Sequence, residues 1–334
     1  MLKVGQLEEH LAKRQENAIT AQLGNFKVSD DASELTITNG VQSTAILAMD
    51  EVATKAVTKY LHIPTSYYNN LEPDFRATLL SYEIERNKEV ATTAEILNGD
   101  LVAVHQPSQI MLSQKGIAKV IGKVFDDEDT IQRFIADSTR LHVDVTTNQH
   151  VYEFPTVNDQ GVQVGDITEA GARFLAHPYK AVDPSVTVYA HRLTCMNGQT
   201  TPERHGRISI KGSTVDEVLV SMEEAANEIL GQLDVYLEKL ATTRTMPVPG
   251  SPQAFAAQLA REQNLSRQVL DKVLDIINQL PEPVTIWDVN QAFTSVANQT
   301  ESYAAMMRMQ NIGGSLAFDA ETQIQRCTSC ERRL

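Results

Sequence analysis

The chain has 334 residues, of which 42% are hydrophobic and 22% are charged. These fractions are ordinary for globular proteins, and they exclude a wholly disordered, collagen-like or disulfide-dense chain. The 43 acidic residues outnumber the 29 basic ones, and the net charge of −14 excludes a long-range attraction to nucleic acid. Any phosphate binding must therefore come from a local basic patch.

Other features of the composition predict a cytoplasmic protein. The cysteines are Cys195, Cys327 and Cys330, which suit a reducing compartment better than a disulfide framework. The segment from Met1 to Glu16 carries charges where a signal peptide needs an apolar stretch. No run approaches about 18 uninterrupted apolar residues. We therefore expect no membrane-spanning segment.

The first third of the chain alternates helical and strand patterns. Hydrophobic residues three and four positions apart predict helices, and strict alternation predicts strands. Glycine and proline mark where these elements end. In chain order we expect a helix over 2–11, a strand over 34–38, a helix over 52–61, a polar aromatic loop at 64–68, a helix over 72–86 and a hairpin over 95–112 that turns at 98–100.

A helix with a basic face is expected after this hairpin. Lys115, Lys119 and Lys123 recur every four residues and share one face, which favours either a solvated surface or a face for an anionic ligand. The acidic run 126–129 predicts the start of the next helix, because carboxylates are stabilised there. From about 140 to 212, short Val, Thr and Tyr-rich segments between Gly and Pro predict a mainly antiparallel sheet.

One long helix is expected over 215–240. Its apolar positions form a single stripe, and its other face carries seven carboxylates beside Lys239 alone. That face should repel nucleic acid. The carboxylates are Asp216, Glu217, Glu223, Glu224, Glu228, Asp234 and Glu238.

The C-terminal third should be helical. Three prolines and a glycine within 245–252 predict a linker, after which Ser251 caps a helix with Pro252 at its first position. We expect helices over 252–281 and 285–298, then a mobile polar tail beyond Gly313 and Gly314. The chain is therefore predicted to be α+β, with mixed helices, a mainly antiparallel sheet and a helical C-terminal part. The expected divisions are 1–150, 151–244, 245–252 and 253–334.

The densest group of basic residues lies between positions 190 and 212, where four bases outweigh one acid. Arginine gives phosphate a two-pronged donor, and glycine lets the backbone approach closely. The alternative is that Arg192 and Arg204 pair with acids of the following helix and that Cys195 is a buried core residue. The nucleic-acid-binding residues that we expect are Arg192, Arg204, His205, Arg207 and Lys211, extended by Lys115, Lys119 and Lys123.

Signals for catalysis or metal binding are incomplete. Cys195 with His191 or His205 would make a thiol nucleophile, since an imidazole lowers a thiol pKa. Cys327 and Cys330 have the spacing of a zinc knuckle but lack two further ligands nearby. Phosphate-loop, dinucleotide-binding, zinc-protease and serine-hydrolase motifs are all absent. We therefore expect no metal and no cofactor, and the balance favours a protein without catalysis.

Three stretches of the chain resemble a phage and plasmid-like family called domain of unknown function 932. The first is 51–86 with its loop from His62 to Tyr68, the second is 164–198 followed by Arg204 and His205, and the third is 284–298 around Trp287. The resemblance implies a mobile-element origin and no particular reaction. The family-like positions of the second stretch, which we expect to form a motif turn, are Gly165, Asp166, Cys195, Asn197 and Gly198.

Two functional hypotheses follow. The first is an accessory protein of nucleic-acid metabolism that binds single-stranded DNA or RNA through its basic residues. Homo-oligomerisation would concentrate several weak patches on one strand. The second is a protein-interaction module that modulates or inhibits a host or phage factor through the acidic helix at 215–240.

Overall fold

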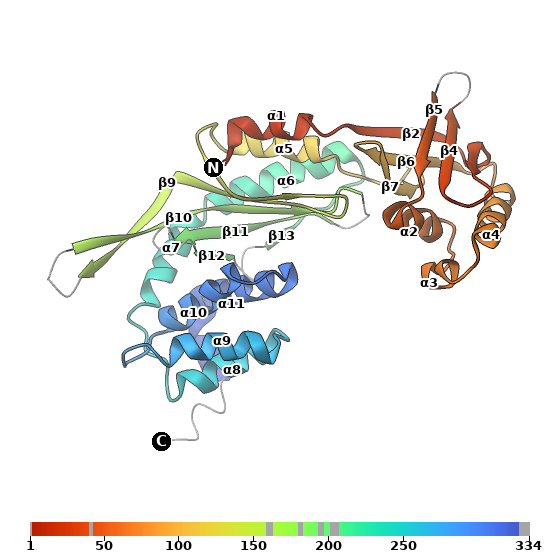
Figure 1. Cartoon of the computed structure of the whole chain (residues 1–334). Coiled ribbons are helices and arrows are strands. Elements are labelled where there is room, and N and C mark those ends of the chain that lie inside the picture. Colours follow the sequence, from red (N-terminus) through yellow and green to blue (C-terminus); the bar gives the residue numbers. More distant parts are fainter. Residues whose placement is uncertain are drawn as a thin grey trace.

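The computed structural model describes residues 2–39, 43–157, 163–179, 183–192, 197–200 and 207–326. It has antiparallel sheets and a helical C-terminal part, so the α+β prediction is confirmed. Figure 1 shows an N-terminal lobe at one end, a central sheet with helices along one face, and C-terminal helices beside the opposite face. Each of these parts has its own cluster of buried hydrophobic residues. Within the described ranges, no helix is long and apolar enough to cross a membrane.

The largest sheet among the described residues has seven strands, and every neighbouring pair is antiparallel. Strand β13 pairs with β11 beside β12, and the other strands follow the order β1-β8-β9-β10-β11-β12. The expected antiparallel sheet is therefore confirmed. The strands are β1 (Leu2–Lys3), β8 (Thr130–Ala136), β9 (Leu141–Val157), β10 (Gln163–Ala176), β11 (Ser185–Arg192), β12 (Asn197–Thr200) and β13 (Arg207–Ser209).

The pleat of β9 and β10 sends alternate residues to opposite faces of this sheet. Val143 lies opposite Phe174 on one face, and Asp144 lies opposite Arg173 on the other. All four side chains are at most 1% exposed. One face is therefore mainly hydrophobic, whereas the other buries charged groups under the C-terminal helices.

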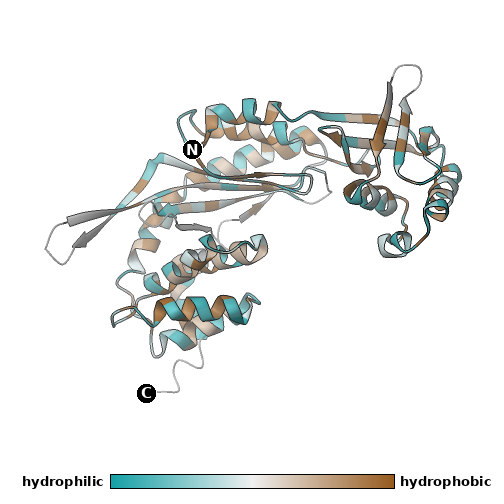
Figure 2. Cartoon of the chain, in the orientation of Figure 1, coloured by the Kyte–Doolittle hydropathy of each residue, from teal (hydrophilic) through white to brown (hydrophobic). Residues whose placement is uncertain are grey.

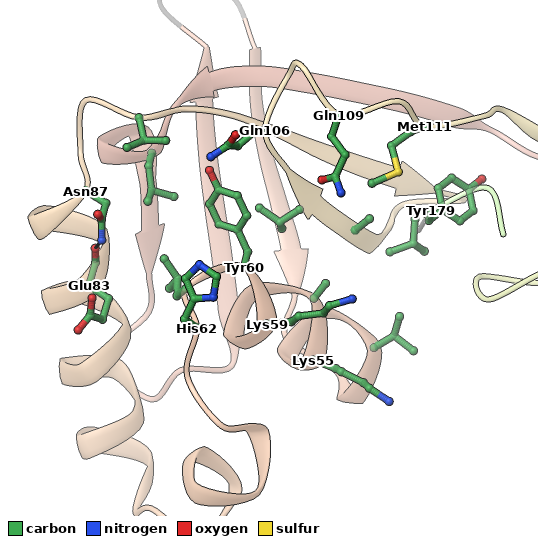
Figure 3. A pocket seen from close by; sticks show the side chains of 18 of the residues that line it. Lys55, Lys59, Tyr60, His62, Glu83, Asn87, Gln106, Gln109, Met111 and Tyr179 are labelled. Carbon is green, nitrogen blue, oxygen red and sulfur yellow. Dashed lines mark hydrogen bonds between the residues drawn. The ribbon is translucent and has the colours of Figure 1, made fainter. Parts of the chain in front are cut away.

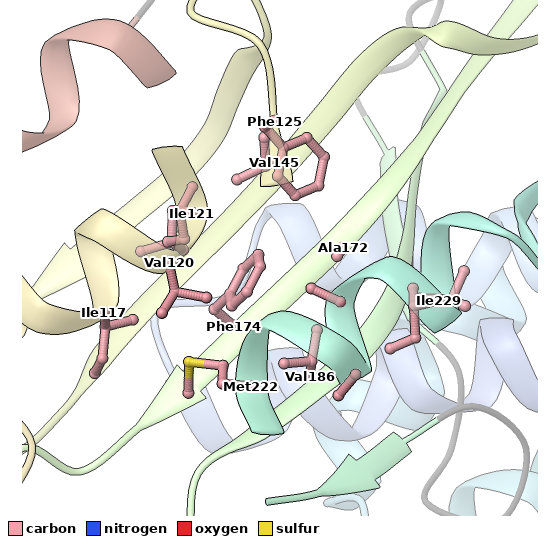
Figure 4. Packing of buried hydrophobic residues seen from close by; sticks show 14 of the residues in the cluster. Ile117, Val120, Ile121, Phe125, Val145, Ala172, Phe174, Val186, Met222 and Ile229 are labelled. Carbon is pink, nitrogen blue, oxygen red and sulfur yellow. The ribbon is translucent and has the colours of Figure 1, made fainter. Parts of the chain in front are cut away.

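Three helices cover the hydrophobic face: α1 (Leu7–Ala12), α5 (Gln114–Val124) and α6 (Val215–Leu230). In Figure 4, Ile121 of α5 and Met222 of α6 lie around Phe174 of the sheet. These side chains are at most 1% exposed. Full burial of a side chain of this size stabilises the fold by about 1.5–3 kcal/mol.

The N-terminal lobe spans 16–105 and has a separate core, in which Leu35, Ile37 and Leu80 are fully buried. The expected division 1–150 contains this lobe together with residues 2–12 and 114–150, which belong to the central sheet and its helices. Its elements are β2 (Glu16–Gln22), β6 (Ala91–Leu97) and β7 (Asp100–His105) in one sheet, β3 (Phe26–Val28), β4 (Glu34–Asn39) and β5 (Ser43–Ala48) in a second, and the helices α2 (Glu51–Tyr60), α3 (Thr65–Asn69) and α4 (Pro73–Arg86).

The C-terminal helices are α7 (Leu233–Thr242), α8 (Pro252–Glu262), α9 (Arg267–Ile277), α10 (Ile286–Asn298) and α11 (Tyr303–Arg326). Helices α8 to α11 share one core. The predicted cap is confirmed, because the Ser251 hydroxyl accepts from the Ala254 amide and Pro252 is the first residue of α8. Figure 2 shows hydrophobic and hydrophilic residues interspersed along these helices, as expected for elements with one buried face.

Two helices that the sequence predicts as continuous are each divided. The expected helix over 215–240 is interrupted at Gly231 and Gln232, between α6 and α7, where glycine has a low helix propensity. The expected helix over 252–281 is interrupted between α8 and α9, where Asn264 has a left-handed φ of 51°. Hydrophobic spacing continues across Gly231, so periodicity does not reveal the first interruption. The second falls in the polar stretch 261–268, in which Leu265 is the single apolar residue.

The expected helix over 2–11 is shorter, because residues 2–3 form β1 and α1 begins at Leu7. Two further local predictions in the first half are wrong. The acidic run 126–129 does not start a helix but leads into β8, which pairs with β9 in the central sheet. The segment 64–68 is not a loop, because α3 begins at Thr65 with Pro64 as its N-cap. Proline is common at helix starts, so Pro64 was a signal for a helix as well as for a loop.

Two C-terminal predictions are also corrected. Gly313 and Gly314 do not start a loose tail, because both are buried inside α11 and the Asn290 amide of α10 donates to the Gly313 carbonyl at 2.9 Å. The segment 245–252 is anchored, because the Val248 amide donates to the Val284 carbonyl at 2.9 Å. The glycines and prolines at these positions therefore lie in packed segments of the chain.

Candidate functional site

The predicted basic group does not form one exposed surface among the described residues. Arg192 ends β11, where its Nη1 donates to Gln291 Oε1 at 3.0 Å and its guanidinium lies 5.3 Å from the Trp287 ring centre. The residue therefore joins the sheet to α10. Lys211 is exposed after β13, and of Arg207 only the backbone is described. Arg204 and His205 lie outside the described residues.

The predicted motif turn is distributed over two strands. Gly165 and Asp166 lie within β10, in a hairpin with β9 that extends beyond the rest of the sheet (Figure 1). Asn197 and Gly198 are the first residues of β12 and pair with the end of β11. These four residues are therefore strand residues rather than turn residues. Cys195 lies outside the described residues, as do Cys327 and Cys330.

The lysine row on α5 is exposed as predicted. Lys123 forms an ion pair with Glu223 of α6 at 2.9 Å, whereas Lys115 and Lys119 form none within the described parts of the chain. Gly116 lies against Leu219, so the beginnings of α5 and α6 are neighbours. The basic face of α5 therefore lies beside the acidic face of α6, which weakens its attraction for anions.

A groove of about 1350 Å³ lies between the N-terminal lobe and one end of the central sheet (Figure 3). Helix α2 supplies one wall, and the segments around Gln106, Gln109 and Thr139 supply another. Asp50 starts α2 by accepting from the Ala53 amide at 2.8 Å, and the resulting register brings one face of the helix to the groove. A cavity of this size exceeds the usual volume of a small-molecule pocket.

Lys55 and Lys59 are exposed on this wall, one helical turn apart, and neither forms an ion pair among the residues that the structure describes. The groove lining also contains Arg86, Glu51 and Glu83. Arg86 and Glu83 lie 3.8 Å apart and partly neutralise each other. The lining therefore has three cations against two carboxylates, and Lys55 and Lys59 are the cations without an ion pair among the described residues.

Hydrogen bonds fix the polar groups around the groove. The Tyr60 hydroxyl pairs with Thr92 Oγ1 at 2.9 Å, and the Tyr179 hydroxyl donates to Glu16 Oε1 at 2.8 Å. Burial and the hydrogen bond with Glu16 raise the pKa of Tyr179, so this residue stays a neutral phenol. Tyr179 therefore contributes an uncharged hydroxyl to the groove wall near neutral pH.

A second polar group lies on the other face of the central sheet, beneath α11. Arg173 binds Asp144 through two hydrogen bonds, and the His142 Nε2 lies 2.7 Å from Asp144 Oδ1. The Tyr303 hydroxyl is 2.9 Å from His142 Nδ1, and Arg173 also donates to Gln310 Oε1 at 2.8 Å. This buried cluster, which we call the Asp144 cluster, ties α11 to β9 and β10.

The charges of this cluster follow from its partners. Burial alone would raise the pKa of Asp144, but Arg173 and His142 hold it well below its usual range. Burial lowers the pKa of His142, so its ring is neutral. Because the Asp144 carboxylate only accepts, His142 Nε2 carries the hydrogen and Nδ1 accepts from the Tyr303 hydroxyl.

A pocket of about 340 Å³ opens beside this cluster. Arg140, His177 and Tyr303 contribute its polar groups, and Leu141 and Met307 contribute apolar surface. The pocket also shares Thr139 with the groove, so the two lie on either side of the turn between β8 and β9. Among the described residues, no group of three or more His, Cys, Asp or Glu side chains is placed to hold a metal ion.

Sequence reasoning missed both sites. The signal for the groove was the spacing of Lys55 and Lys59 within a helix that was correctly predicted. The signal for the Asp144 cluster was the pair His142 and Asp144, two residues apart between valines of a strand. Such polar residues share the face opposite the valines, and a sheet covered on both sides must pair them.

No family model, curated protein or solved structure matches this chain. The resemblance to domain of unknown function 932 therefore stays a prediction.

Proposed function

We propose that the chain is a phage or mobile-element accessory protein of nucleic-acid metabolism that binds single-stranded DNA or RNA in the groove, without catalysis. The observation that carries this proposal is the exposed pair Lys55 and Lys59 on the groove wall. The mobile-element context rests on the resemblance of three sequence stretches to domain of unknown function 932.

The geometry of the lysine pair suits a single strand. Residues four apart on a helix have Cβ atoms about 5–6 Å apart, so both ammonium groups reach neighbouring phosphates of one strand. The facing wall carries uncharged polar side chains, including Gln106, Gln109 and Thr139. Those groups offer donors and acceptors to base edges, which are accessible in a single strand and paired in a duplex.

The acidic balance of the chain supports a localised site. A net charge of −14 repels a polyanion from most of the surface. Phosphate contacts are thereby restricted to places where cations outnumber the nearby carboxylates, as they do in the groove lining. Such binding depends on few contacts and weakens as salt increases.

The test is fluorescence anisotropy of a labelled single-stranded oligonucleotide with two matched double variants. Lys55→Gln/Lys59→Gln removes the groove pair, and Lys115→Gln/Lys119→Gln removes an exposed pair of the same spacing on α5. We expect the α2 variant to lose about tenfold in affinity, which corresponds to about 1.4 kcal/mol. The α5 variant should lose less, because the acidic face of α6 lies beside it. A loss confined to the α5 variant would move the strand from the groove to α5 and contradict the proposal.

A second candidate function is docking of a host or phage protein. On the outer faces of α6 and α7, Val220 and Val235 are 52% and 53% exposed, and the exposed Glu224 and Glu228 follow Val220 at successive spacings of four residues. Exposed apolar residues on helices that also carry carboxylates favour a partner with apolar anchors and basic flanks. A pull-down with wild type and with Glu224→Lys/Glu228→Lys tests this function, and a partner retained equally by both proteins would contradict it. Glu223 is left unchanged because it pairs with Lys123.

A further inference from the structure

The pocket beside the Asp144 cluster combines an apolar surface with polar groups of both kinds. Leu141, Leu175 and Met307 line it, and the Tyr303 ring closes one side. The Arg140 guanidinium lies 4.3 Å from the centre of that ring. A volume of about 340 Å³ is near the lower end of the range for ligand pockets, about 300–1,000 Å³.

The hydrogen bonds behind the pocket determine what its polar groups offer. His177 Nδ1 lies 2.8 Å from the Thr139 carbonyl, which only accepts, so Nδ1 donates, and in the tautomer with one ring hydrogen Nε2 is an acceptor. The Tyr303 hydroxyl gives its hydrogen to His142, so its oxygen also accepts. Arg140 is the donor of the pocket. Its Nε lies 3.3 Å from Asp137 Oδ2, which fixes the guanidinium beside Tyr303 and partly neutralises its charge.

Three ligand features match this arrangement: a flat apolar body, an N–H donor and a negative charge. A nucleotide has all three, because its base stacks on aromatic and apolar side chains, its amino or imino groups donate, and its phosphate binds arginine. Free phosphate would leave the apolar surface uncovered, and an aliphatic acid would leave the two acceptors without donors.

The position of the pocket connects it to the groove. Thr139 lines both, so a strand that follows the groove reaches the pocket at the turn between β8 and β9. Resting on the proposed function, we infer that the pocket beside Arg140 and Tyr303 holds one nucleotide of the single strand that is bound in the groove. The groove then supplies phosphate contacts, and the pocket supplies the contact to a base.

The experiment titrates each of the four nucleoside monophosphates into the full-length protein and follows binding by calorimetry. We expect the wild type to bind at least one of them. Leu175→Phe, which fills the pocket without changing its charge, and Arg140→Gln should each weaken that binding about tenfold or more. Lys272→Gln, on the exposed face of α9, is the control for loss of a cation and should bind as the wild type does. Circular dichroism and a thermal melt establish that each variant is folded, and Leu175→Phe carries the test where Arg140→Gln does not fold.

Three results would overturn the inference. One is the absence of monophosphate binding by the folded wild type. Another is inorganic phosphate binding as tightly as the nucleotides, which would make the site one for free phosphate. The third is a bound mononucleotide that an oligonucleotide does not displace, which would make the ligand a free nucleotide rather than part of a strand. Strand affinity measured in parallel separates these results from a failure of the proposed function, since a protein that binds strands but no mononucleotide retains the groove.

Discussion

Arg173 and Asp144 face each other across β10 and β9 and form a two-pronged ion pair in which both side chains are 0% exposed. The pair is neutral overall, and His142 and Gln310 complete its hydrogen bonds. A buried ion pair contributes little over a well-packed apolar pair, but leaving either charge alone is costly. The pair therefore specifies how α11 lies on the sheet.

Replacing one partner of this pair should destabilise the protein strongly. We expect Arg173→Met to lower the free energy of unfolding by about 3 kcal/mol, because the buried Asp144 carboxylate then has only Arg133, 3.9 Å away, as a counter-charge. The double variant Arg173→Met/Asp144→Leu should lose less than the sum of the two single variants. Urea unfolding followed by circular dichroism measures this, and additive losses would mean that the two side chains do not act as a pair.

The neutral state of His142 predicts a pH dependence. Burial lowers its pKa below the ordinary value of about 6.5. Between the two pKa values, His142 is therefore protonated in the unfolded chain and neutral in the folded protein. The stability that this residue provides is complete above about pH 6.5 and is lost as the pH falls from there toward the lowered folded pKa. The slope is at most about 1.4 kcal/mol per pH unit.

His142→Gln should flatten that slope, as measured by urea unfolding between about pH 7 and pH 5. His62→Asn is the control for replacing a histidine, because His62 is exposed and asparagine tolerates its left-handed φ of 57°. A wild-type slope retained in His142→Gln would show that other groups produce it.

His105 predicts the opposite dependence. Burial would lower its pKa, but hydrogen bonds with Glu95 and the Gln106 carbonyl outweigh burial and raise it. The stability from this contact is present below the unfolded pKa of about 6.5 and is lost as the pH rises through the raised folded pKa. In Glu95→Gln, the loss of stability above about pH 6.5 should be smaller than in wild type. An equal loss would exclude this ion pair as the cause.

Replacing Gly171 should cause a steric clash, and the same replacement at Gly122 is the control. A Cβ at Gly171 would lie 2.1 Å from the Val145 carbonyl oxygen of β9, next to the irregular register at Glu169 and Ala170. Gly171→Ala should therefore cost roughly 3 kcal/mol, since the strand itself must shift. Gly122→Ala in α5 meets no atom within 4 Å and should stabilise the helix by about 0.5–1 kcal/mol. Thermal melts of both variants compare the two, and equal effects would contradict the close approach of β9 and β10.

Arg192 predicts a change in fluorescence and in stability. Its guanidinium and that of Arg244 lie 5.3 and 5.0 Å from the ring of Trp287, the single tryptophan of the chain. Arg192→Ala should shift the tryptophan emission and lower stability by about 1 kcal/mol. A change in the strand affinity of this variant can therefore be interpreted only together with its change in stability. Unchanged emission would mean that Arg192 does not contact Trp287 in solution.

Local signals predicted most of the elements because local rules decide them. The helix over 72–86, the cap at Ser251 and the antiparallel sheet follow from spacing, capping chemistry and β-branched composition. The division of 215–240 into α6 and α7 does not, because the apolar stripe continues across Gly231 while tertiary packing bends the chain there.

The sites were harder to predict because each combines distant parts of the sequence. The groove joins α2 to segments near Gln106, Thr139 and Tyr179, and no spacing rule brings those together. The predicted importance of Arg192 came from the local excess of basic residues and from the neighbouring glycines. Its position beside Trp287 shows that a local excess of cations does not imply an exposed basic patch.

The most direct test of the account is the salt dependence of single-strand affinity for wild type and for Lys55→Gln/Lys59→Gln. Each phosphate contact of a single strand contributes about 0.7 to the slope of log K against log salt concentration. The account predicts that the double variant has a slope about 1.4 smaller than that of wild type, with weaker binding at low salt. Equal slopes in the two proteins would show that these lysines do not contact phosphate, and would contradict strand binding in the groove.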